Sequence, residues 1–220
     1  MTIGLPGIDR LPSMDRLPAQ ERGITIGDFL VPIRLSERIN VRVRHVALIL
    51  AGTILIALAA QVSIPVPGSP VPITGQTFGV LLSAGALGFR RAIAATLLYL
   101  ILGTVGLPVF AHGSHGTDIV LGATGGYLVG FVLAAAVVGR LAELGWDRNV
   151  LGGIGAMLIG SVLIYAVGLP WLMAVAHFDL PTALDKGMIP YLLGDAVKLA
   201  LAAAAFPLAW WVVGRRPGDR

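Results

Sequence analysis

Two opposite charges stand close together in an otherwise apolar stretch near the C-terminus. Asp195 and Lys198 lie in the sequence Gly194-Asp195-Ala196-Val197-Lys198, and apolar residues follow for a full membrane span. A helix places positions i and i+3 on one face, and a charge at membrane depth costs about 2.5–3.5 kcal/mol on insertion scales. Two interpretations are open. The residues form an ion pair that holds the last helix against a neighbour, or they form a ligand site in which the carboxylate accepts N–H donors and the ammonium meets an anion.

A glycine-rich turn and two uncharged polar residues are the next candidates. Gly125 and Gly126 precede Tyr127. Glycine lets a backbone or a ligand approach closely, and tyrosine offers a flat apolar ring with a hydroxyl. Close helix packing through small residues is an equal alternative. Thr74 and Gln76 are expected to hydrogen-bond either a ligand or a neighbouring helix.

The remaining polar side chains form no recognisable catalytic or metal-binding set. His112 and His115 flank Ser114 in a loop whose nearest acid is Asp118, and a metal site needs more ligands. A solvated loop is the better interpretation. The apolar stretches offer no histidine to activate Ser114 or Ser161, the chain has no cysteine, and the pattern G-x-x-x-x-G-K-[ST] is absent. The sequence therefore predicts no enzyme, no metal and no cofactor.

The composition around these candidates is that of a membrane protein. Of 220 residues, 56% are hydrophobic and 13% are charged, against about 25% charged in soluble domains, which excludes an ordinary water-soluble enzyme. Because a bilayer leaves no water for open backbone groups, membrane spans should be helices. The sequence predicts an all-α fold with a tight turn at Phe89–Arg91, a kink or break at Pro170, and six transmembrane helices over residues 46–62, 73–89, 91–107, 119–141, 150–176 and 188–214.

The basic residues predict the orientation of these spans. Fourteen of the sixteen lysines and arginines would fall on one side, while Lys186 alone falls on the other and Lys198 lies inside the last span. The positive-inside rule then places both termini in the cytoplasm. The net charge of +4 is therefore a signal of topology, and no nucleic-acid partner is expected.

The chain divides into three expected parts. Residues 1–45 are predicted to be a cytoplasmic, mostly disordered extension, residues 46–214 the six-helix domain, and residues 215–220 a cytoplasmic tail. Two outer segments stand out within the domain. Residues 63–72 hold four prolines and should be stiff and extended. Together with residues 108–118 they either cap an outward-facing cavity or serve as two ordinary connectors.

Four motifs occur in order along the chain at compatible spacing. They are Val71–Thr77 (VPITGQT), Gly103–Phe110 (GTVGLPVF), Gly122–Leu128 (GATGGYL) and Gly194–Lys198 (GDAVK). Residues 46–214 thereby resemble the BioY family, the substrate-binding membrane subunits of biotin transporters. The resemblance implies the six-helix S-component fold of energy-coupling factor (ECF) transporters in the cell (inner) membrane. It also implies high-affinity capture of biotin from outside, with a membrane coupling subunit and cytoplasmic ATPase subunits as partners.

The same resemblance implies roles for individual residues. The expected biotin-binding residues are Asp195, Lys198, Tyr127, Gln76, Thr74, Gly125, Gly126 and Ser114. Ala47 and Ala51, a small-xxx-small pair in the first span, resemble the alanine pair that S components use against their coupling subunit. The chain departs from the family at two positions. Ala123 stands where proline is usual, and Leu128 stands where some members have arginine, so that a ligand carboxylate depends more on Lys198.

Biotin suits the chemistry of the charged pair. It has a ureido ring with two N–H donors, an apolar bicycle and a valerate chain that ends in a carboxylate. Asp195 suits the N–H donors and Lys198 the carboxylate if the two side chains diverge; otherwise one contacts the ligand and the other orients it. An S component for another vitamin is the alternative, and a membrane channel is a less favoured one.

Overall fold

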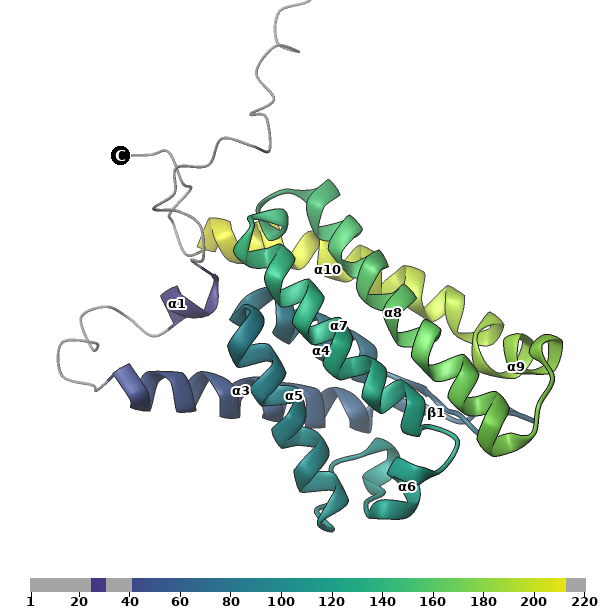
Figure 1. Cartoon of the computed structure of the whole chain (residues 1–220). Coiled ribbons are helices and arrows are strands. Elements are labelled where there is room, and N and C mark those ends of the chain that lie inside the picture. Colours follow the sequence, from purple (N-terminus) through teal and green to yellow (C-terminus); the bar gives the residue numbers. More distant parts are fainter. Residues whose placement is uncertain (1–24, 31–40, 213–220) are drawn as a thin grey trace, which may run out of the picture.

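The computed structural model describes residues 25–30 and 41–212. Within these ranges the chain is almost wholly helical (Figure 1). The α-helices are α1 (Gly27–Leu30), α3 (Val41–Gln61), α4 (Gln76–Leu87), α5 (Phe89–Thr104), α6 (Thr117–Leu121), α7 (Gly125–Glu143), α8 (Val150–Ala176), α9 (Leu180–Gly187) and α10 (Leu192–Val212). The shorter elements are the strands β1 (Ser63–Ile64) and β2 (Ile73–Thr74) and the 3₁₀ turns η2 (Ala111–Gly113), η3 (Trp146–Arg148) and η4 (Ile189–Tyr191).

Helix α7 occupies the centre of the bundle, between α5 and α8 (Figure 1). It also packs against α4, while α3 packs on α4 and α5, and α10 packs on α8 and α4. Small residues make this closeness possible. A Cβ on Gly139 would lie 2.8 Å from backbone atoms of Gly88 and Phe89, and one on Gly130 would lie 2.9 Å from the Cα of Ile164. Glycine at these two positions therefore sets how close α7 comes to its neighbours.

Four helical segments of the described chain are long and apolar enough to cross a membrane. They are Val41–Gln61, Gly125–Glu143, Val150–Ala176 and Leu180–Trp211, the last of which covers α9, η4 and all of α10 except its final residue. Helix α4 is apolar but has 12 residues, and α5 has 16 residues. The prediction of a helical multi-pass membrane protein is confirmed at this level, and the six-span topology stays a prediction.

The turn between α4 and α5 lies one residue earlier than predicted. Gly88 alone separates the two helices, with φ of +78°, a backbone conformation that favours glycine. Phe89, Arg90 and Arg91 already belong to the first turn of α5. The turn was predicted at Arg90 and Arg91 because charged residues are typical of loops. The change of chain direction between α4 and α5 needs only the glycine.

Other limits differ as well. The predicted span 119–141 is two helices, α6 and α7, which are separated at residues 122–124. Helix α8 continues without a break past Pro170 to Ala176. Outside the helices, β1 and β2 pair antiparallel, with Ser63 opposite Thr74, and this pairing closes the proline-rich segment into a loop.

The N-terminal part is more ordered than predicted where the structure describes it. Helix α3 begins at Val41, inside the expected extension, and residues Thr25, Ile26 and Gly27 are buried. The rest of the extension (1–24 and 31–40) and the expected tail (215–220) lie outside the described residues.

The bundle has two chemically different ends. At one end α3 and α5 begin and α4 and α7 finish, and this end, called the basic end below, carries Arg44, Arg91, Arg140 and Arg148. At the opposite end, called the cavity end, α3 and α5 finish and α7 begins. Residues 63–72 and 108–118 connect the helices there.

Candidate functional site

A cavity of about 320 Å³ lies at the cavity end. Residues from α4, α7, α8 and α10 line it, together with residues of both outer segments. Its volume lies at the lower end of the range of about 300–1,000 Å³ that is typical of small-molecule sites. The wall is largely aromatic and aliphatic, with Phe110, Tyr127, Phe131 and Ile164, and a small group of polar side chains faces inward.

Asp195 and Lys198 converge on each other in this cavity. The Lys198 Nζ donates to Asp195 Oδ1 at 3.0 Å and to Thr77 Oγ1 of α4 at 2.7 Å. Their side chains are 16% and 19% exposed, so the pair is largely removed from solvent. The side chains therefore do not diverge, and the arrangement in which they would reach opposite ends of a ligand is not the one found.

Tyr165 of α8 completes this polar group, although the sequence analysis did not single it out. Its hydroxyl donates to Asp195 Oδ2, and its ring packs edge-on against Tyr127 with centroids 6.4 Å apart. Tyr165 and Thr77 both line the cavity. The available signals were a tyrosine hydroxyl inside the apolar span of α8 and the last residue of the motif Val71–Thr77.

Thr74 at the end of β2 and Gln76 at the start of α4 line the same cavity. The Thr74 Oγ1 donates to Gln76 Oε1 at 3.0 Å, and the Gln76 Nε2 donates to the hydroxyl of Tyr99 in α5. Gln76 is 7% exposed. Both expected polar residues are therefore in the cavity wall, where Tyr99 of α5 bonds Gln76 and Gln76 in turn bonds Thr74.

The glycine-tyrosine motif divides between two roles. The Tyr127 ring lines the cavity, and its hydroxyl donates to the carbonyl of Gly187 at 2.9 Å. Gly125 and Gly126 are not in the lining. A Cβ on Gly126 would collide with the side chain of Trp171, and one on Gly125 would collide with the carbonyl of Val120. These two glycines thus serve close packing, which was the alternative interpretation of the motif.

Both outer segments cover the cavity, as a cap requires. Ser114 and His112 line it from residues 108–118. Gln61, at the end of α3, fixes that segment: its Nε2 donates to the Phe110 carbonyl at 3.2 Å, and its Oε1 accepts from the Gly113 N–H at 3.1 Å.

The proline-rich segment is tied down at its other side. Pro70, Val71 and Pro72 line the cavity. The Tyr191 hydroxyl donates to the Val71 carbonyl at 2.6 Å, and the Ser69 Oγ lies 2.9 Å from the same hydroxyl. Two outer segments and η4 thereby form a roof over the polar group on α10.

The chain is similar in sequence to proteins of a known family. The model of the BioY family matches residues 34–215. The chain belongs to the BioY family. It is 41% identical over 158 residues to the biotin transporter BioY of Thermotoga maritima, across 71% of this chain and 90% of that protein. It is 39% identical over 171 residues to the biotin transporter BioY of Rhodobacter capsulatus, across 72% and 88%.

A solved structure of similar fold supports the same assignment. The crystal structure at 2.1 Å of the S-component for biotin from an ECF-type ABC transporter superposes with a TM-score of 0.70 at 26% identity. The match covers 76% of this chain and 90% of that one. The BioY resemblance drawn from the sequence motifs is thus confirmed.

All four BioY motifs meet at the cavity. Val71–Thr77 and Gly122–Leu128 each contribute several lining residues, Gly103–Phe110 contributes Phe110, and Gly194–Lys198 contributes its two charged residues. The two positions at which this BioY chain departs from the family pattern, Ala123 and Leu128, also belong to the lining. Segments far apart in the sequence are therefore brought to one site.

Ala47 and Ala51 lie elsewhere on this BioY protein. Both are exposed on α3, on the face that also presents Ile54 and Leu58 (56% and 64% exposed). The opposite face of α3 packs against α4 and α5. The alanine pair is therefore on an open helix surface outside the cavity.

Proposed function

We propose that this BioY protein captures biotin in the cavity at the cavity end and is the biotin-binding membrane subunit of an ECF-type uptake transporter. The observation that carries the proposal is the meeting of four BioY motifs at one cavity of about 320 Å³. The relatives named biotin transporter BioY and the similar biotin S-component support the ligand. An uptake subunit needs a binding site and a partner that supplies ATP hydrolysis, and it performs no chemistry on its ligand.

The polar group on α10 suits the ureido ring of biotin. Asp195 is the acceptor for a ureido N–H, and hydrogen bonds to a charged group contribute about 1.5–3 kcal/mol each. Lys198, at 3.0 Å from that carboxylate, neutralises and orients it, since the two converge. Tyr165 holds the second oxygen of Asp195. A carboxylate fixed from two sides presents its free lone pairs in one direction, which favours a ligand of fixed geometry.

The remaining wall suits the apolar bicycle and the valerate chain. The Tyr127 ring supplies a flat apolar surface, while Thr74, Gln76 and Ser114 supply hydrogen-bonding groups around it. Gly125 and Gly126 act indirectly, by letting Trp171 of α8 pack close against α7 next to Tyr127. In this arrangement a single polar end recognises one part of biotin, and the apolar wall encloses the rest.

The proposed topology has six spans. Helices α3, α4, α5, α7, α8 and α10 would each cross the inner membrane, with the basic end and both termini in the cytoplasm. The arginines gathered at the basic end support this orientation through the positive-inside rule. The cavity then opens outward. The exposed Ala47 and Ala51 on α3 would contact the membrane coupling subunit, which carries the cytoplasmic ATPase subunits.

A vitamin panel tests the proposed ligand. Purified protein in detergent is titrated with biotin, thiamine and riboflavin, with tryptophan fluorescence as the readout, because Trp171 contacts the Gly122 carbonyl beside the cavity at 2.9 Å. Only biotin should give a saturable change. Mass spectrometry of ligand released from the natively purified protein should detect biotin. Saturable binding of another vitamin with no response to biotin contradicts the proposal.

A further inference from the structure

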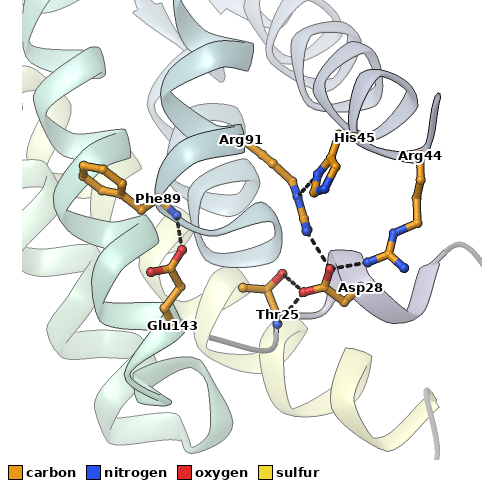
Figure 2. A network of polar contacts seen from close by, with 7 residues as sticks. All are labelled: Thr25, Asp28, Arg44, His45, Phe89, Arg91 and Glu143. Atoms are coloured by element: carbon orange, nitrogen blue, oxygen red, sulfur yellow. Dashed lines mark hydrogen bonds and ion pairs between the residues drawn. The ribbon is translucent and has the colours of Figure 1, made fainter. Parts of the chain in front are cut away.

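A short N-terminal segment is seated in the basic end of the bundle (Figure 2), at the end opposite to the cavity. Residues Thr25–Asp28 precede or begin α1 and reach the point where α3, α4, α5 and α7 meet. Ile26 is 4% exposed and belongs to the main hydrophobic core. A polar extension that made no contact with the bundle would leave Ile26 exposed to solvent. Because Ile26 is buried in the core instead, this segment is part of the fold.

The fit of the backbone is close. A Cβ on Gly27 would lie 2.9 Å from the carbonyl oxygen of Ala86 and 3.3 Å from a methyl carbon of Leu87. On the other side of the turn, a Cβ on Gly88 would lie 2.9 Å from the methyl carbon of Thr25. The segment therefore packs directly on the turn between α4 and α5, and any larger residue at position 27 would push it away.

Asp28 joins α3 and α5, which no loop connects at this end of the bundle. Its Oδ1 accepts from the Nη2 atoms of Arg44 in α3 and of Arg91 in α5, each at 2.7 Å (Figure 2). Its Oδ2 accepts from the N–H and the hydroxyl of Thr25, both at 3.1 Å. The Arg91 Nε also donates to His45 Nδ1 at 3.0 Å. One carboxylate thus bridges the first turns of α3 and α5.

The bridge is charged at neutral pH. Burial alone would raise the pKa of Asp28, but the hydrogen bonds and charge of Arg91 and the bonds from Thr25 hold it below its ordinary value. The other acid nearby, Glu143 of α7, is engaged by the Phe89 N–H at 2.9 Å and by Arg140 at 2.9 Å. Without Asp28, two guanidinium groups that now meet at one oxygen atom would repel each other.

Helix α3 packs on the bundle with one face only, where Thr53 also donates to the Ala95 carbonyl of α5 at 3.0 Å. Its apolar window is 28% buried, against 61% for the central α7, and it packs mainly on α4 and α5. Arg44 lies three residues before Ala47, so the Asp28 bridge holds the turn that begins the open face of α3.

We propose that Thr25–Asp28 is an intramolecular clasp that fixes the start of α3 against α5 and thereby sets the position of the outer α3 face, with Ala47 and Ala51, for the coupling subunit. The identity of that partner rests on the proposed function. The bridge between the first turns of α3 and α5 does not, because it is given by the contacts of Asp28 with Arg44 and Arg91. Asp28 is therefore a positioning residue for assembly and has no part in ligand contact.

Two variants separate this role from simple stabilisation. Asp28→Asn keeps the shape of the side chain and removes its charge, while Gly27→Val keeps the charge and displaces the segment by collision with Ala86. Asp185→Asn in α9, an exposed acid at the other end, is the matched control. Because the chain has no cysteine, spin labels at Val43→Cys and Arg90→Cys report the spacing of α3 and α5 without background.

The full-length protein is examined in nanodiscs for spacing, by calorimetry for biotin, and by co-purification with the coupling module. In both clasp variants the distance distribution should broaden toward longer distances, biotin affinity should stay within about twofold of the parent, and recovery of the coupling subunit should fall at least about fivefold. The control should match the parent in all three measurements.

Several results would overturn the clasp. They are an unchanged distance distribution, unchanged recovery of the coupling subunit, or loss of biotin binding in both variants, since the last would make the segment a general folding element. Failure of the parent protein to bind biotin would contradict the proposed function instead. The spacing measurement would then still decide whether Thr25–Asp28 fixes α3.

Discussion

The charged pair of the cavity is held from three helices. Lys198 and Asp195 come from α10, Thr77 from α4 and Tyr165 from α8. Desolvation of an ion pair can cost more than its attraction returns unless the remaining donors and acceptors are satisfied. Here each member has a second partner. These contacts therefore offset the desolvation cost of the ion pair inside the bundle, and they fix its geometry before any ligand arrives.

The hydroxyl of Tyr165 should matter for biotin although the sequence motifs do not include it. Tyr165→Phe removes the donor to Asp195 Oδ2, so the carboxylate loses part of its orientation, and biotin affinity should fall about tenfold, or about 1.4 kcal/mol. Tyr127→Phe is the matched control, because the Tyr127 hydroxyl serves the Gly187 carbonyl. Calorimetry that finds equal losses in the two variants would remove Tyr165 from this role.

Asp147 should make stability depend on pH. It is 2% exposed in η3, its Oδ2 accepts from the Trp210 Nε1 at 2.9 Å, and burial raises its pKa from 3.8 to about 6. A carboxyl group with a raised folded-state pKa destabilises the fold as pH rises through this interval, here by up to about 3 kcal/mol. The Tm in detergent should therefore be higher at pH 5 than at pH 7.5. Asp147→Asn should flatten this dependence, and an equal slope in the variant would refute the assignment.

For single residues, the residue types and their spacing in the sequence predicted part of the cavity lining. The i, i+3 spacing predicted that Asp195 and Lys198 share a face, and the motifs pointed to Tyr127, Thr74 and Gln76. Tyr165 and Thr77 were missed because their partners lie 30 and 121 residues away along the chain. Contacts of that kind depend on how helices pack, and no local pattern encodes them.

Among the elements, the roof is fastened at two separate points. Gln61 holds residues 108–118 to the end of α3, and Tyr191 holds residues 63–72 to η4. Both fastenings use few hydrogen bonds, each contributing about 0.5–1.5 kcal/mol. Release of either segment from its neighbour would therefore break only these few side-chain hydrogen bonds at that point.

Loosening the roof should change the rate of ligand release. Tyr191→Phe removes the hydroxyl that reaches the Val71 carbonyl and lies beside Ser69 Oγ. The dissociation rate of biotin should rise up to about tenfold, since about 1.4 kcal/mol corresponds to a factor of ten. Stopped-flow tryptophan fluorescence measures it, with Tyr99→Phe on the far side of Gln76 as a comparison. A dissociation rate equal to that of the parent would show that the fastening does not control release.

Helices were predictable from the sequence where a long apolar run defines them, and their ends were less predictable elsewhere. Apolar runs identified α3, α7, α8 and α10, whereas the position of the α4–α5 turn was wrong because it depends on the single positive φ of Gly88. The break between α6 and α7 was missed although it falls at residues 122–124, inside the glycine-rich motif Gly122–Leu128, because apolar residues flank it on both sides. Its cause is tertiary, since Trp171 of α8 donates to the Gly122 carbonyl at this point.

Over the whole molecule, the two ends of the bundle differ in the charged residues that they carry. In the described residues, arginines gather at the basic end, where Asp28 bridges Arg44 and Arg91 and Glu143 pairs with Arg140, and the cavity end presents the roof and the α10 pair. Composition predicted the membrane class, and the arginine pattern predicted that one end would be basic. Neither predicted that residues 25–28 would be packed into that end, because a short segment flanked by polar sequence carries no periodic signal.

The proposed binding of biotin depends on a carboxylate, that of Asp195, which accepts a hydrogen bond from the ligand in the cavity. Calorimetric titration of biotin into the purified parent protein and into Asp195→Ala tests this most directly, with the exposed Asp185→Ala as the matched control. The parent and the control should bind alike. Asp195→Ala should lose about 1.5–3 kcal/mol or more of binding free energy, at least about a tenfold weaker affinity. Equal biotin affinity in the parent and in Asp195→Ala would contradict the proposed site.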